Sequence, residues 1–171
     1  MQQIFDSHAH YDDAAFDPDR AALLASLPGQ GVCGIINAAS NLASARAGIA
    51  LAAQYGYLYA AVGIHPLDAE TAPDLDNAMT QLRVLAAQPK VVAIGEIGLD
   101  FHYDVPRVIQ LPLLRRQLAL ANDLHLPVIL HDREAHGPML DLLREFRPAG
   151  VVHCFSGSVE MAREVLALGL Y

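Results

Sequence analysis

The sequence predicts an α/β protein with a parallel sheet, specifically a (β/α)8 barrel of which this chain carries about six βα units. Short runs rich in valine, isoleucine and leucine alternate with helix-like segments along all 171 residues. Such continuous hydrophobicity suits strands that are covered on both faces. Histidine or glutamate also recurs where these runs end. This favours a barrel, because functional groups of barrels come from the ends of many different strands.

Six apolar runs, bounded by polar or glycine-rich sequence, are expected to form the strands. They are residues 3–7, 32–38, 58–64, 91–97, 127–131 and 150–154. Their starts recur roughly every 25–35 residues, which is a spacing that suits βα units with right-handed crossovers. An open, doubly wound sheet is the competing architecture. The chain lacks the phosphate-loop fingerprints GxGxxG and GxxxxGK[ST] that many such sheets carry.

Helices are expected between these strands. Their approximate ranges are 17–27, 41–55, 74–87, 107–125, 134–146 and 158–168. Asp17 with Pro18, Asn41 and Ser158 have the residue types that cap helix N-termini. Pro112 leaves the start of the fourth helix open, because proline disrupts a helix interior.

The barrel is expected to be incomplete at the C-terminus of this single domain, residues 1–171. A barrel of this type needs about 250 residues, and this chain stops at Tyr171, where a seventh strand could begin. An open barrel leaves two unpaired sheet edges and an uncovered core. We therefore expect the chain to be unstable alone, or to pair with another copy of itself or with a further segment.

Composition narrows the classes of function. The net charge of −8, with Lys90 as the single lysine, argues against broad, charge-driven nucleic-acid binding. It does not exclude an enzyme acting on nucleic acid, because bound divalent cations reverse the local field. Cys33 and Cys154 lie in apolar runs and are expected to be buried thiols. No signal peptide or membrane span is expected, since Met1 leads directly into a strand, so the predicted location is the cytoplasm.

The first candidate metal ligands are His8 and His10. Residues i and i+2 of a strand project to the same side, so both imidazoles can grip one cation. Glu96 is the next candidate, because a carboxylate deep in an apolar strand is costly unless it is paired or bound to metal. It could bridge two cations, and Gly95 and Gly98 would allow close backbone approach beside it. A buried Glu–Arg pair is the alternative interpretation of Glu96.

His131 and His153 each end a short apolar run. By strand alternation, Ile129 should point with His131, and Val151 with His153. Alone, each histidine would suit a core position. Together with the other candidates they supply enough nitrogen and oxygen ligands for two divalent metal ions.

His65 and Arg133 are candidates for contact with a substrate. His65 follows an apolar run but precedes Pro66 and an acidic loop, which indicates a position at the rim. A structural or capping role is its alternative. Arg133 could meet an anionic group of a substrate, or pair with a nearby carboxylate.

Five segments together resemble one known family, the TatD-type metal-dependent hydrolases, also called TatD DNases. They are Asp6–Asp12, Gly63–Pro66, Gly95–Asp100, Leu126–Ala135 and His153–Ser158. Their order and spacing match over essentially the whole chain. The resemblance implies a metal-dependent (β/α)8 TIM-type barrel of the wider amidohydrolase group. It also implies exonucleolytic cleavage of DNA phosphodiester bonds, with single strands or DNA ends as the substrate.

By this resemblance the metal ligands are His8, His10, Glu96, His131 and His153. Glu96 would be the bridging and catalytic carboxylate, and His65 would lie near the substrate phosphate. The two divalent ions would be Mg²⁺, Mn²⁺ or Zn²⁺. The family also uses an aspartate at the end of its eighth strand, and no residue here corresponds to it.

Two other hypotheses remain open. The same centre could hydrolyse a small amide or ester, as in the wider amidohydrolase group. Such enzymes often carry a carboxylated lysine as the bridging ligand, but Lys90 lies before its strand and Glu96 takes the bridging place. Alternatively, the chain is an inactive fragment that lacks the last metal ligand.

Overall fold

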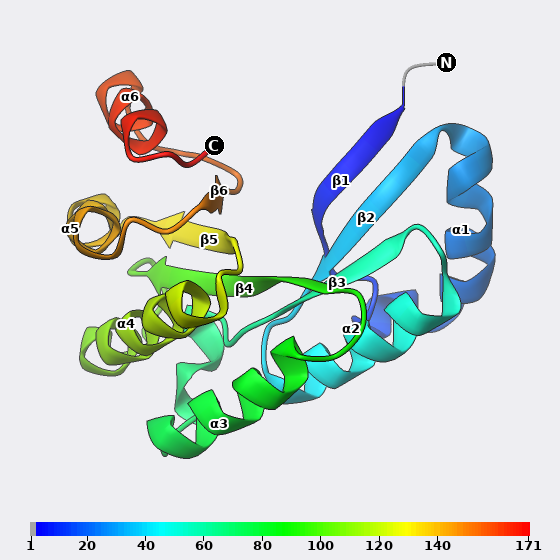
Figure 1. Cartoon of the computed structure of the whole chain (residues 1–171), viewed down its shortest axis with the longest axis horizontal. Coiled ribbons are helices and arrows are strands. Elements are labelled where there is room, and N and C mark those ends of the chain that lie inside the picture. Colours follow the sequence, from blue (N-terminus) through cyan, green and yellow to red (C-terminus); the bar gives the residue numbers. More distant parts are fainter. Residues whose placement is uncertain (1–2) are drawn as a thin grey trace.

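The computed structural model describes residues 3–171. Met1 and Gln2, on which the prediction of an N-terminus without a leader partly rests, lie outside the described residues. Within 3–171, six parallel strands form one sheet in sequence order. They are β1 (Ile4–Ala9), β2 (Val32–Ala38), β3 (Leu58–Val62), β4 (Val91–Asp100), β5 (Val128–Arg133) and β6 (Gly150–Val152). Figure 1 shows the sheet curling into a half-barrel, so the predicted fold is confirmed.

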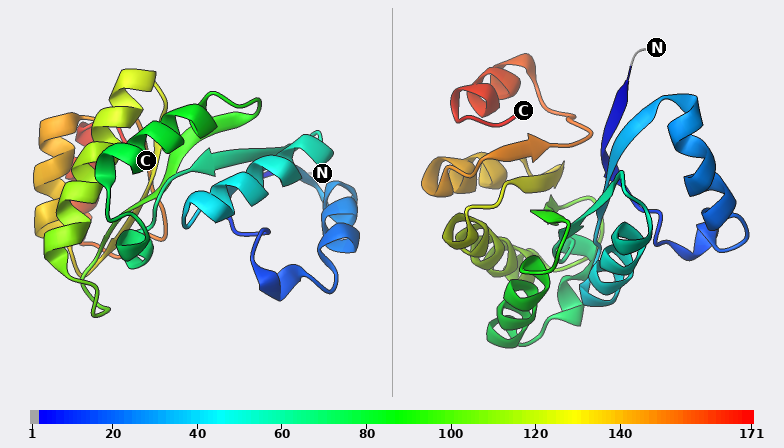
Figure 2. Two further views of the ribbon diagram at one scale, coloured as in Figure 1. Left: turned by 90° about the horizontal axis from the view of Figure 1, so that it is seen from below. Right: turned by 45° about the vertical axis from the view of Figure 1, so that its right-hand side comes forward.

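The helices follow the strands along the chain and lie on the outer, convex side of the sheet (Figures 1 and 2). They are α1 (Arg20–Ser26), α2 (Leu42–Gln54), α3 (Leu75–Ala86), α4 (Arg107–Leu124), α5 (His136–Phe146) and α6 (Val159–Ala167). Short 3-10 helices, η1 (Ala14–Phe16), η2 (Leu27–Gln30) and η3 (Pro66–Thr71), complete the connections. Parallel strands require such crossovers, and the helices bury the outer face of the sheet.

Two of the three predicted helix caps are confirmed. The side chain of Asn41 accepts hydrogen bonds from the backbone of Ala43 and Ser44, and Ser158 caps α6 in the same way. The prediction that Asp17 and Pro18 begin a helix was wrong. These residues fall in the turn after η1, Asp17 pairs with Arg20 at 2.7 Å, and α1 begins only at Arg20.

Helix α4 runs without interruption through Pro112. Because Pro112 is only the sixth residue of this helix, its missing N–H removes one hydrogen bond near the N-terminus rather than in the middle. At the other end of the chain, Leu170 forms a parallel bridge with Gly150. The backbone N–H of Val152 donates to the carbonyl of Tyr171 at 2.8 Å. The prediction that a further strand could begin at Leu170 is therefore consistent with the observed pairing.

The prediction of two buried thiols was wrong. Cys33 and Cys154 are both free and exposed. Cys33 lies at the start of β2, beside the edge strand β1, where little packs over it. Cys154 lies in the turn after β6 with a φ of 47°, outside the strand that would have buried it.

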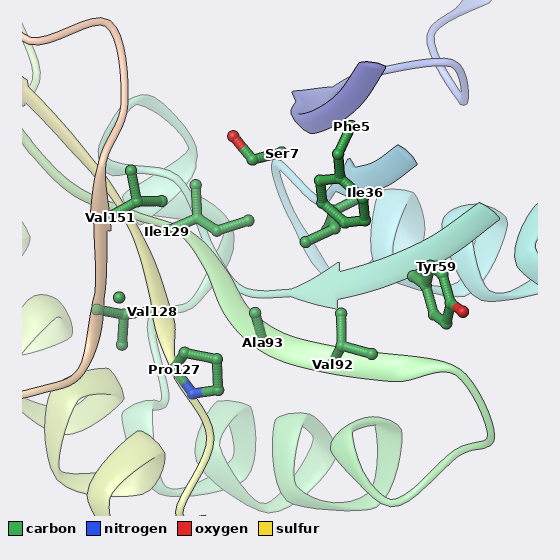
Figure 3. Close-up of a pocket in the computed structure, with 11 residues that line it drawn as sticks. Phe5, Ser7, Ile36, Tyr59, Val92, Ala93, Pro127, Val128, Ile129 and Val151 are labelled. Carbon is green, nitrogen blue, oxygen red and sulfur yellow. The ribbon is translucent and has the colours of Figure 1, made fainter. Parts of the chain in front are cut away.

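The concave face of the sheet is apolar over much of its length. Phe5, Ile36, Ala93, Ile129 and Val151 point toward one another from different strands (Figure 3). They line a cavity of about 390 Å³. The larger core lies on the convex side, between the sheet and the helices. Within the described part of the chain, no helix has the length and hydrophobicity needed to cross a membrane.

Candidate metal centre

A buried carboxylate surrounded by imidazoles lies at the carboxyl end of the sheet. Glu96 is 3% exposed, within β4. His8 lies in β1, His131 lies in β5, and His153 follows β6 directly. His10 and His65 lie just beyond β1 and β3. The structure brings together all the residues predicted as ligands, although they come from segments far apart in the sequence.

One oxygen of Glu96 faces the two histidines of β1. Its Oε2 atom lies 3.3 Å from His8 Nε2 and 3.2 Å from His10 Nε2. The two Nε2 atoms are 2.9 Å apart. Three ligand atoms of three residues therefore form a compact triangle, as the HxH spacing predicted.

The other oxygen of Glu96 faces the histidines of later segments. Its Oε1 atom lies 2.6 Å from His153 Nε2, 3.1 Å from His131 Nδ1 and 3.5 Å from His65 Nε2. The ring of His153 also stacks on that of His8, with centroids 3.8 Å apart. Glu96 thus separates two groups of imidazoles. No arginine pairs with it among residues 3–171, so the alternative of a buried Glu–Arg pair was wrong.

The donor set fits divalent cations. When nitrogen and oxygen ligands lie about 2.0–2.2 Å from a cation, neighbouring ligand atoms lie roughly 2.9–3.5 Å from one another. The triangle of His8, His10 and Glu96 has this spacing. By proximity, a second group contains His65, Glu96 and His131, whose ligand atoms lie within 4.8 Å of one another. A buried carboxylate among imidazole nitrogens is a donor set that suits zinc, manganese or iron.

Hydrogen bonds behind the rings distinguish the histidines. The Nδ1 atom of His10 lies 2.8 Å from the carbonyl of Ala38, to which it can only donate. Its Nε2 atom is then free to present a lone pair toward Glu96. His131 is held from its far side in the same way, because Nε2 lies 2.9 Å from Oδ2 of Asp100. Its Nδ1 atom faces the centre.

His65 has the opposite arrangement. Its Nδ1 atom accepts a hydrogen bond from the backbone N–H of Leu67 at 3.1 Å. In the neutral ring, Nε2 therefore carries the hydrogen and faces the centre as a donor. This arrangement supports the expected role beside a substrate better than a role as a ligand. In His8, Nδ1 is buried without a partner among residues 3–171.

Electrostatics keep Glu96 ionised. Burial raises the pKa of its carboxyl, but hydrogen bonds from His10, His131, His153 and His65 outweigh burial and hold that pKa far below its ordinary value. Hydrogen bonding to Glu96 in turn raises the pKa of His10, against the effect of its own burial. The centre therefore contains a fixed negative charge that attracts cations, either protons or metal ions.

Asp100 belongs to the same network. Burial raises the pKa of its carboxyl, but hydrogen bonds from His131 and from the backbone of Tyr103 and His102 outweigh burial and lower it. Burial lowers the pKa of His131, and the hydrogen bonds to Glu96 and Asp100 raise it overall. Sequence reasoning missed this role of Asp100. Its position four residues after Glu96, at the end of the same apolar run, was the available signal.

Gly95 and Gly98 of β4 allow the backbone of β5 to approach closely, as predicted from the sequence. A Cβ atom on Gly95 would lie 2.7 Å from the Cβ of Ile129. On Gly98 it would overlap the backbone oxygen of His131. Only glycine lets β4 and β5 come this close on either side of Glu96.

Two buried glutamines of α4 hold the strand ends from behind, and sequence reasoning missed both. Gln117 donates to the carbonyl of Ile64 at 3.0 Å and accepts from the N–H of the same residue at 2.8 Å. Gln110 makes the equivalent pair of bonds with Asp100, at 2.7 and 2.8 Å. They lie seven residues apart, on one face of the helix. Each glutamine fixes the backbone at or next to a residue of the centre. Polar residues on the apolar side of a helix were the signal.

Arg133 lies at the rim of the centre. Within residues 3–171 it forms no ion pair, and its guanidinium lies 5.1 Å from the ring centroid of Tyr103. A cavity of about 280 Å³ joins Arg133 to His131 and His153. Its other lining residues are Asp132, Cys154 and Ser156. The alternative of an ion pair for Arg133 was therefore wrong.

Lys90, the residue that a carboxylated-lysine centre would need, lies elsewhere. Its ammonium group donates to the carbonyls of Ala52, at 2.6 Å, and Tyr55, at the C-terminal end of α2. These bonds satisfy the end of that helix. The structure thus places no lysine of the described chain beside Glu96.

Comparison with known proteins gives the class to which this fold and site belong. The model of the family of TatD-related DNases matches residues 5–171, so this chain belongs to that family of metal-dependent hydrolases. The chain is 36% identical to YabD, an uncharacterized metal-dependent hydrolase of Bacillus subtilis. The alignment covers 98% of this chain and 67% of YabD. The chain is 38% identical to the 3'-5' ssDNA/RNA exonuclease TatD of Cronobacter turicensis, over 98% of this chain and 65% of that protein. It thus spans about two thirds of these relatives.

Solved structures agree. The crystal structure of YjjV, a TatD homologue from Escherichia coli, superposes with a TM-score of 0.90 at 39% identity, over 98% of this chain and 66% of YjjV. A hydrolase of the TatD family from Entamoeba histolytica gives a TM-score of 0.87 at 26% identity, over 99% of this chain and 64% of that one. An uncharacterized amidohydrolase from Saccharomyces cerevisiae, at 20% identity and a TM-score of 0.80, shares the fold.

Proposed function

We propose that this chain carries the metal centre of a hydrolase that cleaves phosphodiester bonds in DNA from an end, with single strands as the preferred substrate. One observation carries the proposal: imidazoles at the ends of four strands face the two oxygens of one buried carboxylate, Glu96. The relative named as an exonuclease of single-stranded DNA and RNA supports the choice of substrate. The acidic chain would depend on bound cations to accept a polyanion.

In this proposal His8 and His10 would hold one divalent ion, His131 and His153 would hold a second, and Glu96 would serve both through its two oxygens. Mg²⁺, Mn²⁺ and Zn²⁺ are the candidates, and the histidine-rich set suits Mn²⁺ or Zn²⁺ better than Mg²⁺. Such ions would supply Lewis-acid polarisation of the phosphoryl oxygens and would acidify the attacking water.

The protein's own groups would orient the substrate. The Nε2–H of His65 faces the centre and would donate to an oxygen of the scissile phosphate. Arg133 would pair with a neighbouring phosphate, since its guanidinium has no carboxylate partner among residues 3–171. Asp100 would hold His131 in the tautomer that presents Nδ1. These groups act together by position rather than by covalent chemistry.

Hydrolysis with and without chelator tests the proposal. The chain, loaded with Mn²⁺, Zn²⁺ or Mg²⁺, is incubated with a single-stranded oligonucleotide labelled at either end, and with a cyclic amide. We expect metal-dependent shortening of the oligonucleotide from one end and no turnover of the amide. Nuclease activity that survives EDTA, or turnover of the amide alone, would contradict the proposal. No activity with any metal would favour an inactive fragment.

We also propose that a second copy of the chain covers the apolar concave face in solution. Phe5 of the edge strand β1 lines the cavity of Figure 3 and is 55% exposed, and its neighbour Ile4 is 54% exposed. Exposed apolar edge strands tend to pair with other chains. Light scattering after gel filtration should give a dimer, and Phe5→Lys should shift it to a monomer. A monomeric wild-type chain at micromolar concentration would contradict this proposal.

The assignment of residues 1–171 to one barrel domain and a cytoplasmic location also remain predictions.

A further inference from the structure

An exposed tyrosine lies beside the candidate metal centre, in the loop between β4 and α4. The side of Tyr103 that faces away from the protein is open, since the residue is 50% exposed. The guanidinium of Arg133 lies over its ring, 5.1 Å from the centroid. The ring of His102 meets it edge-on, with centroids 5.0 Å apart. An aromatic ring with a cation against it, left open to solvent, is an arrangement that can accept a second planar group.

The loop that carries Tyr103 is tied to the centre by a single carboxylate. One oxygen of Asp100 accepts hydrogen bonds from the backbone N–H groups of His102, at 3.0 Å, and Tyr103, at 3.3 Å. The other oxygen holds His131 at 2.9 Å. The backbone at Tyr103 is therefore held at a set position relative to His131. His102 is held further by Glu134, at 2.8 Å.

Open space beside the centre is lined by the same arginine that contacts this ring. The cavity of about 280 Å³ is lined by His131, His153 and Arg133, and the guanidinium of Arg133 lies against the ring of Tyr103. A phosphate at the centre would thus have its neighbouring nucleotide near Arg133 and Tyr103. Because the chain is acidic overall, general attraction for the backbone is weak, and local contacts must hold the strand.

We propose that Tyr103, backed by Arg133, is a stacking platform for a nucleobase next to the scissile phosphate of a single-stranded substrate. This inference rests on the proposed function and adds a binding subsite to it. Stacking on an aromatic face is available to every base, so the platform gives affinity for single strands without sequence preference. A base within a duplex is already stacked and cannot use it.

Binding measurements test the platform apart from catalysis. The probe is a fluorescein-labelled, phosphorothioate-linked oligodeoxythymidylate, which resists hydrolysis, and its anisotropy is followed in Mn²⁺. We expect Tyr103→Ala to weaken binding by about 5- to 100-fold, the contribution of one stacked base. Tyr103→Phe should stay within about twofold of wild type, because the ring remains. Tyr171→Ala is the matched control, since Tyr171 is 84% exposed elsewhere on the chain.

A substrate lacking one base provides the second arm. An abasic nucleotide beside the terminal linkage should weaken binding to the wild-type chain as much as Tyr103→Ala does. It should cost nothing further in that variant, because the same contact is already lost. Three outcomes would each overturn the platform. The losses of binding from the abasic nucleotide and from Tyr103→Ala could add, the Tyr103→Ala and Tyr171→Ala variants could bind the oligonucleotide equally well, or the wild-type chain could show no measurable binding.

The two proposals fail in different ways. Bis(p-nitrophenyl) phosphate has no nucleobase, so its metal-dependent hydrolysis by the wild-type chain tests the proposed function alone. Hydrolysis of this compound with unchanged oligonucleotide binding by Tyr103→Ala would remove the platform and leave the function. Ring-dependent binding without hydrolysis of any phosphodiester would do the reverse.

Discussion

The two ends of the concave face have opposite chemistry, although the same strands build both. In β5, Ile129 lines the apolar cavity and His131 faces Glu96. In β6 and the turn after it, Val151 likewise lines the apolar cavity and His153 faces Glu96. Because residues i and i+2 of a strand share a face, one strand can pack with its middle and carry chemistry at its end. In β5 and at the end of β6, a step of two residues therefore separates the side chain that packs from the side chain that faces the centre.

Replacing the carboxylate at the polar end is expected to have the largest effect. Glu96→Gln removes the charge shared by both groups of imidazoles, so both ions should be lost. We expect hydrolysis to fall on the order of 10³-fold, because metal-ion catalysis supplies several kcal/mol of stabilisation. Metal content by mass spectrometry and hydrolysis of bis(p-nitrophenyl) phosphate measure this.

The matched control for that change is Glu70→Gln, an exposed carboxylate of η3. It should keep both metal and activity. A Glu96→Gln chain that binds metal as tightly as the control does would break the distinction between the two ends.

Shortening a side chain at the apolar end should lower stability and spare the metal centre. Ile129 is 2% exposed, and Ile129→Ala is expected to cost about 2–5 kcal/mol of unfolding free energy through lost burial and a cavity. Urea unfolding measures the loss, and calorimetry should give metal affinity within a few-fold of wild type. Val84→Ala, at a residue 60% exposed, is the control and should change stability little. A large loss of metal affinity in Ile129→Ala would show that the two ends are coupled.

The glutamines of α4 sharpen the comparison, because they support the polar end from the convex side. Gln117→Leu leaves the N–H and the carbonyl of Ile64 without partners. We expect a cost of about 1–3 kcal/mol for each group left unpaired, measured by urea unfolding. Gln54→Leu, at an exposed residue of α2, should be nearly neutral. Equal free energies of unfolding for the two variants would show that the two hydrogen bonds between Gln117 and Ile64 contribute nothing to stability.

The smallest effect is expected from Asp100→Asn. The amide keeps the size of the side chain but no longer offers His131 a carboxylate. Loss of such an outer partner costs roughly 10- to 100-fold in metal affinity, which titration calorimetry with Mn²⁺ or Zn²⁺ can measure. Asp104→Asn, on the exposed loop after β4, is the control. An affinity that equals that of the control would mean that Asp100 does not orient His131.

Much of the fold was predictable, because strong periodicity specifies elements even without their partners. The range of β2 agrees with the prediction, and Ile129 and Val151 lie on the concave face with their histidines, as alternation required. Alternation does not hold in β1 and β4. Ser7 and Ala93 line the apolar cavity, yet His8 and Glu96 face the centre. Register shifts fall in both strands, between Asp6 and Ala9 and between Ile94 and Ile97, and these depend on pairing with the neighbouring strand.

By itself, the sequence determined the order of the strands, the helix caps at Asn41 and Ser158, and which imidazoles and which carboxylate would meet. These follow from local periodicity, and from parallel strands placing their carboxyl ends at one edge. Only the tertiary structure decided the tautomer of His131, the pair of hydrogen bonds between Gln117 and Ile64, and the place of Tyr103 against Arg133. Each of these depends on contacts between residues 30 or more positions apart along the chain. Such contacts are set by the packing of strands and helices, which no local pattern in the sequence specifies.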